Sequence, residues 1–281
     1  MNFYNTYAPC EALQDIVEFY WYSKCELEQS LIQEMFTPTF QALSFNLSGW
    51  EEEIVSDSGQ IRMDKPCYII GQPLSKRVSL SNPKGIHILG VKFTALGLYQ
   101  LTGIDMKHIS DKIIDAQEIW NRDIALLYEE ILSKETQLEQ LAALEHFLMK
   151  KRNRQPKNDR IEALNDSLYQ IEHHKIFSIA HIRDNNFISK KTFERYFQNY
   201  IGVSPKQYAN ICRFNKLRSY LDHLNTEADW NDISFDFGYY DQSHLIREFK
   251  RYAGKTPADY ISHHLQKSFS ESEFELQSVL S

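Results

Sequence analysis

The chain has 281 residues, of which 42% are hydrophobic and 25% are charged, and these proportions exclude a disordered, collagenous or fibrous protein. At about 150 residues per domain, this length favours two domains. No segment approaches the roughly 18 to 20 consecutive apolar residues of a membrane helix, and no basic region precedes an apolar run at the start. We therefore expect a cytoplasmic protein with no membrane contact.

The net charge of −7 is divided unevenly along the chain. Residues 1–152 carry −7 and residues 160–267 carry +2, whereas 268–281 contain glutamates and serines but no basic residue. Residues 153–159 are polar and contain Pro156, which is typical of a linker. We expect an N-terminal domain over 1–152, a linker over 153–159, a second domain over 160–267 and an acidic disordered tail over 268–281.

In the N-terminal half, short segments of alternating apolar and polar residues run from Leu31 to about Thr94, broken by glycine and proline. This pattern predicts an antiparallel β-barrel or sandwich. After Gly97 the apolar spacing becomes helical over 98–103, 116–134 and 137–152, so helices are expected to close this domain. The helical pair 116–152 fits a lid on its own sheet and a dimer interface equally well.

Six aromatic residues of these strands fit either the wall of a ligand cavity or the core: Phe36, Phe40, Phe45, Trp50, Tyr68 and Phe93. We favour the core, because aromatics on alternating strands pack inside more often than they line a pocket.

The same half contains no constellation typical of an enzyme. His87, His108 and His146 are single and far apart, and there is no GxSxG, HExxH or P-loop motif. The cysteines have no metal-binding spacing and are expected to be reduced packing residues: Cys10, Cys25, Cys67 and Cys212. The sequence therefore predicts no catalytic residue, no metal site and no cofactor, and the protein is not expected to be an enzyme.

The C-terminal half contains an internal repeat. Residues 189–209 align with 241–261 at an offset of 52, and six of the positions are identical. In each copy a capping residue, Ser189 or Asp241, opens a helix, and a short apolar helix, 178–184 or 230–237, precedes it. A short helix, a tight turn and a second helix form a helix-turn-helix unit. We refer to 178–209 as the first unit and to 230–261 as the second unit.

The second helix of each unit has an apolar stripe and an opposite polar face. A single amphipathic helix would have an ordinary solvated face, but two copies at a fixed spacing favour DNA recognition. Arginine, lysine, glutamine and glutamate are the side chains that meet base edges in the major groove. The predicted DNA-binding residues are Lys190, Lys191, Glu194 and Arg195 in the first unit and Gln242, Ser243, His244, Arg247 and Lys250 in the second.

Residues 160–265 resemble the tandem helix-turn-helix domain of the AraC/XylS family of bacterial transcription regulators. The resemblance is carried by ISKKTFERYFQNYIGVSPKQYANICRFNKLRSYL and by ISFDFGYYDQSHLIREFKRYAGKTPADY. It implies an all-α domain of about seven helices, with one long helix inside 205–224 that joins the units. More loosely, Tyr7 to Leu13 and Gly90 to Phe93 resemble the N-terminal domain of a subgroup of these regulators.

The expected function is that of a sequence-specific transcriptional regulator that inserts two recognition helices into successive major grooves of double-stranded DNA. The N-terminal domain is expected to sense a small-molecule effector, to form a homodimer, or both. An activator would also contact RNA polymerase. The N-terminal charge of −7 would be repelled by phosphates, so DNA contact is expected from the C-terminal half. A non-specific architectural binder would be more basic than +2 over 160–267.

Overall fold

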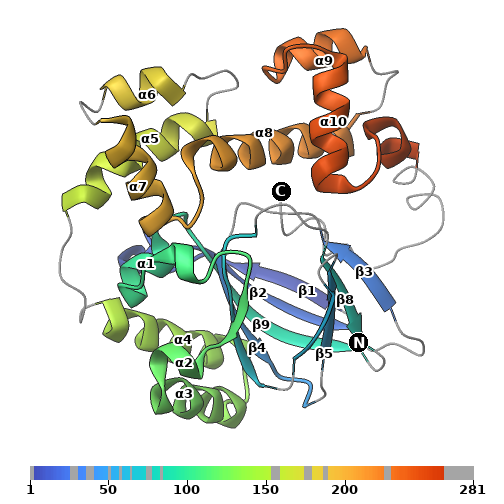
Figure 1. Cartoon of the computed structure of the whole chain (residues 1–281). Coiled ribbons are helices and arrows are strands. Elements are labelled where there is room, and N and C mark those ends of the chain that lie inside the picture. The colour runs from blue at the N-terminus through green and yellow to red at the C-terminus, as the bar shows by residue number, and fades with distance from the viewer. Residues whose placement is uncertain are drawn as a thin grey trace.

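The computed structural model describes residues 3–25, 31–35, 41–49, 52–56, 59–63, 65–73, 78–82, 85–152, 159–173, 179–185, 189–224 and 229–262. Two antiparallel sheets and four helices form the N-terminal half, and the C-terminal half is helical (Figure 1). No helix within these ranges has the length and apolar character needed to span a bilayer. The predicted linker, apart from Asp159, and the predicted tail lie outside the described residues, and the domain boundaries stay a prediction.

The larger sheet has the strand order β1-β2-β9-β4-β7-β10, and the smaller has the order β3-β8-β5-β6. The first sheet contains β1 (Phe3–Tyr7), β2 (Val17–Cys25), β4 (Gln41–Asn46), β7 (Cys67–Ile70), β9 (Ile86–Phe93) and β10 (Ile113–Asp115). The second contains β3 (Leu31–Met35), β5 (Glu52–Ser56), β6 (Gly59–Met63) and β8 (Val78–Asn82). All the strand pairs are antiparallel, as predicted.

Of the two predicted alternatives, a barrel and a sandwich, the closed barrel is wrong, because the described strands form two open sheets with edge strands at β1 and β10 and at β3 and β6. A barrel requires the first and last strands to pair, and they do not pair here. The sequence prediction placed strands only from Leu31 to about Thr94 and so missed β1, β2 and β10. In β2, four aromatic residues in a row, Phe19 to Tyr22, hide the alternation that marks a half-buried strand.

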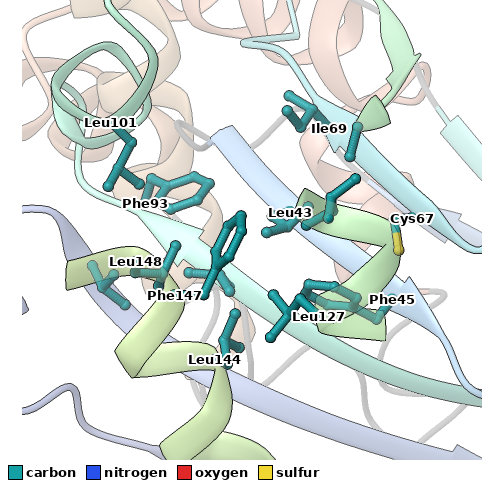
Figure 2. Packing of buried hydrophobic residues seen from close by; sticks show 14 of the residues in the cluster. Leu43, Phe45, Cys67, Ile69, Phe93, Leu101, Leu127, Leu144, Phe147 and Leu148 are labelled. Carbon is teal, nitrogen blue, oxygen red and sulfur yellow. The ribbon is translucent and has the colours of Figure 1, made fainter. Parts of the chain in front are cut away.

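The N-terminal helices are α1 (Gly97–Thr102), α2 (Gln117–Trp120), α3 (Arg122–Ser133) and α4 (Gln137–Arg152). The predicted helix over 116–134 is divided in two, because Asn121 has a φ of 49° that an α-helix cannot continue. Figure 2 shows Leu127, Leu144 and Leu148 of α3 and α4 facing Leu43 and Phe93 of the larger sheet. The helical pair therefore covers its own sheet, as a lid would.

Of the six aromatic residues placed in the core or a cavity, Phe45, Tyr68 and Phe93 are buried. Phe45 and Phe93 belong to the core between the larger sheet and the helices. The other three, Phe36, Phe40 and Trp50, lie outside the residues whose side chains are described.

The C-terminal half contains α5 (Asp159–His173), α6 (Ile179–Asn185), α7 (Lys190–Tyr200), α8 (Pro205–Asp222), α9 (Trp230–Asp236) and α10 (Gln242–Ala253). Residues 257–262 are also helical. Within the described residues, these seven segments agree with the predicted all-α arrangement.

Helix α8 joins the two units and belongs to both of their cores. It begins with a capping box, in which Ser204 Oγ accepts a hydrogen bond from Gln207 N and Ser204 N donates to Gln207 Oε1. Tyr208 and Cys212, near its start, pack in the core of the first unit. Phe214, further along, packs in the core of the second unit. One rigid helix therefore sets the distance between the two units (Figure 1).

Candidate nucleic-acid interface

The two candidate recognition helices, α7 and α10, begin with the same kind of cap. Ser189 Oγ accepts a hydrogen bond from Thr192 N at 3.2 Å, and Asp241 Oδ1 accepts one from His244 N at 2.7 Å. Such a cap satisfies one of the backbone N–H groups that the first turn leaves without a partner. The equivalent caps start both helices at equivalent places in the repeat, as the sequence predicts.

Helix α7 has one buried face and one exposed face. Phe193 and Phe197 are buried with their ring centroids 4.9 Å apart, and Tyr200 continues the stripe. The four residues predicted to contact DNA lie together on the exposed side of this helix: Lys190, Lys191, Glu194 and Arg195. The structure therefore leaves this face open to a partner, and its contact with DNA stays a prediction.

Helix α10 repeats this arrangement. Leu245, Phe249 and Tyr252 are buried in the core of the second unit. Among the predicted DNA-binding residues, Ser243, Arg247 and Lys250 are exposed, and Gln242 and His244 are partly exposed. Ser243, Arg247 and Lys250 follow the spacing i, i+4, i+7, so they form one stripe along the helix.

His244 differs from the other predicted residues, since both of its ring nitrogens face protein groups. Its Nδ1 accepts a hydrogen bond from Tyr240 N at 3.2 Å, and its Nε2 lies 3.6 Å from Glu248 Oε2. Its ring also meets the ring of Tyr239 edge to face, with centroids 5.4 Å apart. Glu248 is four residues further along α10, whereas Tyr239 and Tyr240 belong to the turn before the helix, whose conformation the sequence pattern does not give.

Glu248 is a buried carboxylate on α10, and its side chain is 9% exposed. Arg213 of α8 places Nη1 3.9 Å from its Oε1, and the guanidinium of Arg213 lies 5.2 Å from the ring centroid of Tyr239. Burial raises the pKa of Glu248, and the charge of Arg213 opposes this change. This cluster ties α10 to the joining helix.

The C-terminal end of α7 is held by the N-terminal half. Gln41 Nε2 donates a hydrogen bond to Ile201 O at 2.9 Å, and Ser110 Oγ donates one to Gly202 O at 2.8 Å. Both acceptors are carbonyls at the end of a helix, where intrahelical partners are missing. Side chains of the N-terminal half therefore complete the hydrogen bonding at the end of this helix.

Packing supports the same contact. The rings of Tyr99 and Tyr200 meet edge to face with centroids 4.5 Å apart, and Lys107 Nζ donates a hydrogen bond to Asn199 Oδ1 at 3.1 Å. Leu96, which follows β9, is buried in the core of the first unit. Leu96 therefore extends the apolar core of the first unit into the N-terminal half.

Gly202 is required at the centre of this contact. Its φ of 97° disfavours other residues, and a Cβ at this position would lie 1.9 Å from Ser110 Oγ. The equivalent residue of the second unit, Gly254, also has a positive φ, of 70°, and ends α10.

The sequence analysis missed one exposed residue of α7, Gln198. It lies at the position equivalent to Lys250 in the repeat, since the two are 52 residues apart. Applying the offset to every predicted site residue would have found it.

No group of three or more potential metal ligands was found among the described residues. Three of the cysteines, Cys25, Cys67 and Cys212, are buried, and Cys10 is partly buried. Burial raises the pKa of Cys67 to about 12, so its thiol is held in the neutral form that suits packing.

Two segments of the chain match known domain families. Residues 185–263 match the family described as a helix-turn-helix domain. Residues 5–115 match a domain of unknown function. The first segment includes α7 to α10, and the second includes β2 to β10 and the end of β1.

The curated relatives include the HTH-type transcriptional activator RhaS of Escherichia coli O157:H7, which is 31% identical over 78 residues. The alignment covers 28% of this chain and 27% of that relative, so the chain matches about a quarter of its length.

Two solved structures show a looser likeness. An apo form of ToxT from Vibrio cholerae is 15% identical, with 86% of this chain and 97% of that chain covered and a TM-score of 0.45. The DNA-binding domain of AdpA, solved with a target DNA, is 20% identical, with 37% of this chain and 94% of that chain covered and a TM-score of 0.34. At these TM-scores neither structure constrains the function of this chain.

The repeated units, their capped helices and the family match agree with the resemblance seen in the sequence. The C-terminal part of this chain therefore matches a helix-turn-helix domain.

Proposed function

We propose that this protein is a sequence-specific DNA-binding transcriptional regulator whose helices α7 and α10 enter successive major grooves. The observation that carries this proposal is the pair of equivalent helices, each with an open polar face, at the two ends of α8. At 1.5 Å per residue, the 18 residues of α8 span about 27 Å. This length suits two helices that meet grooves one turn, roughly 34 Å, apart.

The exposed residues suit both base and phosphate contact. Arg195 and Arg247 lie at equivalent positions of the repeat, and each can donate two hydrogen bonds to the O6 and N7 atoms of guanine. Gln242 suits adenine and Glu194 suits the amino group of cytosine. The remaining exposed residues of the predicted set suit phosphates or bases of either kind: Lys190, Lys191, Ser243 and Lys250.

We propose that the N-terminal half regulates this DNA contact through an effector or a homodimer. Support comes from the contact of Gln41, Ser110 and Tyr99 with the end of α7 and the turn after it, because a movement of these groups would move a recognition helix. RhaS is an activator, which supports the same role here and a contact with RNA polymerase. A regulator of this kind acts in the cytoplasm, and we assign it no catalytic activity.

Selection of bound duplexes from a random DNA pool by the full-length protein tests the proposal. We expect one enriched sequence with two conserved segments about one helical turn apart. Repeating the selection with a metabolite library present tests the regulatory part, since an effector would change the yield of bound DNA. Recovery of unrelated sequences at every salt concentration would exclude sequence-specific recognition.

A further inference from the structure

Tyr240 stands directly before the cap of α10, and its side chain is 92% exposed. A large apolar residue at this position usually packs on the residue five places later, which is Leu245 here. With 92% of its surface exposed, the ring of Tyr240 is not packed in this way, and other residues bury Leu245. A single exposed aromatic residue is common on protein surfaces and does not by itself indicate a binding site. A function for Tyr240 therefore has to be supported by the contacts around it.

The backbone at Tyr240 is fixed. Its N–H donates to Nδ1 of His244, and the backbone N–H of His244 donates in turn to Oδ1 of Asp241. These two hydrogen bonds join Tyr240 and Asp241, which precede α10, to His244 in the first turn of the helix. The exposed side chain is therefore attached to a rigid point.

The ring of His244 is itself held from behind. Glu248 Oε2 lies 3.6 Å from its Nε2, and the buried ring of Tyr239 packs against it edge to face. Arg213 of α8 contacts both Glu248 and Tyr239. These contacts hold the ring of His244 against the protein. Since the N–H of Tyr240 donates to this ring, they also fix the backbone at Tyr240.

We propose that Tyr240 is a further DNA-contacting residue of the second unit, that it binds the sugar-phosphate backbone, and that His244 positions it. This inference rests on the proposed function of α10. The start of a recognition helix is the part that reaches furthest into the major groove, so the residue just before it lies where the chain approaches a DNA strand.

The chemistry of Tyr240 suits a backbone contact. Its hydroxyl can donate a hydrogen bond to a phosphate oxygen, and tyrosine is one of the side chains that commonly do so. Only two side-chain torsions have to be ordered on binding, so the entropic cost is small for the area of the ring. A neutral donor adds affinity without displacing a counterion, which distinguishes Tyr240 from Lys250.

The test uses the full-length protein and a duplex that the wild type has selected from a random pool. We expect Tyr240→Phe to weaken binding about three- to ten-fold, the range for one typical hydrogen bond after competition with water. The slope of affinity against salt should stay unchanged, since no counterion is involved. Tyr240→Ala should weaken binding further, because the ring is also lost.

Phe235→Ala is the matched control, since Phe235 is an exposed aromatic of the same unit on α9 with 75% exposure. It should leave the affinity unchanged. The role of His244 is tested by His244→Ala and by the double variant with Tyr240→Ala. If His244 acts by positioning Tyr240, the double variant should bind as weakly as Tyr240→Ala alone.

Three outcomes overturn the inference or its basis in distinguishable ways. Wild-type affinity of Tyr240→Ala for the selected duplex would exclude the contact while leaving the proposed function intact. Additive losses in the double variant would show that His244 contacts DNA itself and would exclude the positioning role. Failure of the wild type to select any duplex would instead contradict the proposed function.

Discussion

The two helix-turn-helix units share their local structure and differ in what surrounds them. In each unit, the second helix begins with a side-chain cap, buries an aromatic stripe and is followed within two residues by a glycine with positive φ. The first unit is packed against the N-terminal half through the end of α7, whereas α10 packs mainly on α8 and α9. The same short sequence signal therefore builds the same unit, and residues outside the repeat decide how freely each unit moves.

The difference has a consequence for regulation. A change in the N-terminal half can reach α7 directly through Ser110 and Gln41, and it can reach α10 through α8. We therefore expect the first unit to respond to the state of the N-terminal half and the second unit to supply constant affinity.

The largest effect is expected from the glycine that ends the first unit. Gly202→Ala should lower the free energy of unfolding by about 2 to 4 kcal/mol, because it combines backbone strain with a clash at Ser110. Gly254→Ala, at the equivalent position, should cost about 1 kcal/mol from backbone strain. Urea unfolding of both variants measures the difference, and equal losses would mean that docking of the first unit adds no stability.

The two arginines should show equal and separate effects on specificity. Arg195→Ala and Arg247→Ala should each reduce discrimination at a few base pairs by about 1 to 3 kcal/mol and leave the other segment of the site unchanged. Site selection with each variant measures this. Loss of the same base pairs in both variants would show that the helices do not read separate segments.

A smaller effect on DNA affinity is expected at the equivalent positions 198 and 250, where only the second unit has a charged residue. Lys250→Ala should weaken binding to all sequences and lower the salt slope by about one unit. Gln198→Ala, at the equivalent position of the first unit, should leave the slope unchanged because no charge is removed. Affinity measured over a salt series compares them, and an unchanged slope for Lys250→Ala would place that side chain away from the phosphates.

The smallest effect concerns pH. Burial raises the pKa of Glu248 from its usual 4.5, so this carboxylate binds a proton more readily in the folded protein than in the unfolded chain. The free energy of unfolding therefore falls as the pH rises above 4.5. Glu248→Gln should remove this part of the pH dependence. Burial also raises the pKa of Glu172, which contributes to the pH dependence in the same direction. Urea unfolding from pH 4 upward measures both, and an unchanged profile in Glu248→Gln would exclude its contribution.

The parts of the fold that depend on neighbours in the sequence were predictable. The offset of 52 residues, the caps at Ser189 and Asp241 and the apolar stripe through Phe193 and Phe197 are local, and they predicted α7 and α10 within a residue or two. The strands from Leu31 to Phe93 also followed from their alternation and from the turn residues between them.

The parts that depend on distant contacts were not predictable. The open sheets follow from which strands pair, and the contact of Gln41 with Ile201 joins residues 160 positions apart. Glu248 lies at i+4 from His244 on α10, but the inward position of His244 also involves Tyr239 and Arg213, which lie outside this helix. The helical spacing predicted which side chains of the candidate site are exposed. It did not predict which groups of the protein these side chains contact.

The most direct test of the tandem arrangement is a hydroxyl-radical footprint of the full-length protein on its selected duplex. Two protected segments should appear about one helical turn, or roughly 10 base pairs, apart, and Arg247→Ala should weaken protection of one of them only. A single protected segment that responds to Arg195→Ala and not to Arg247→Ala would contradict the arrangement, since it would leave α10 outside the groove.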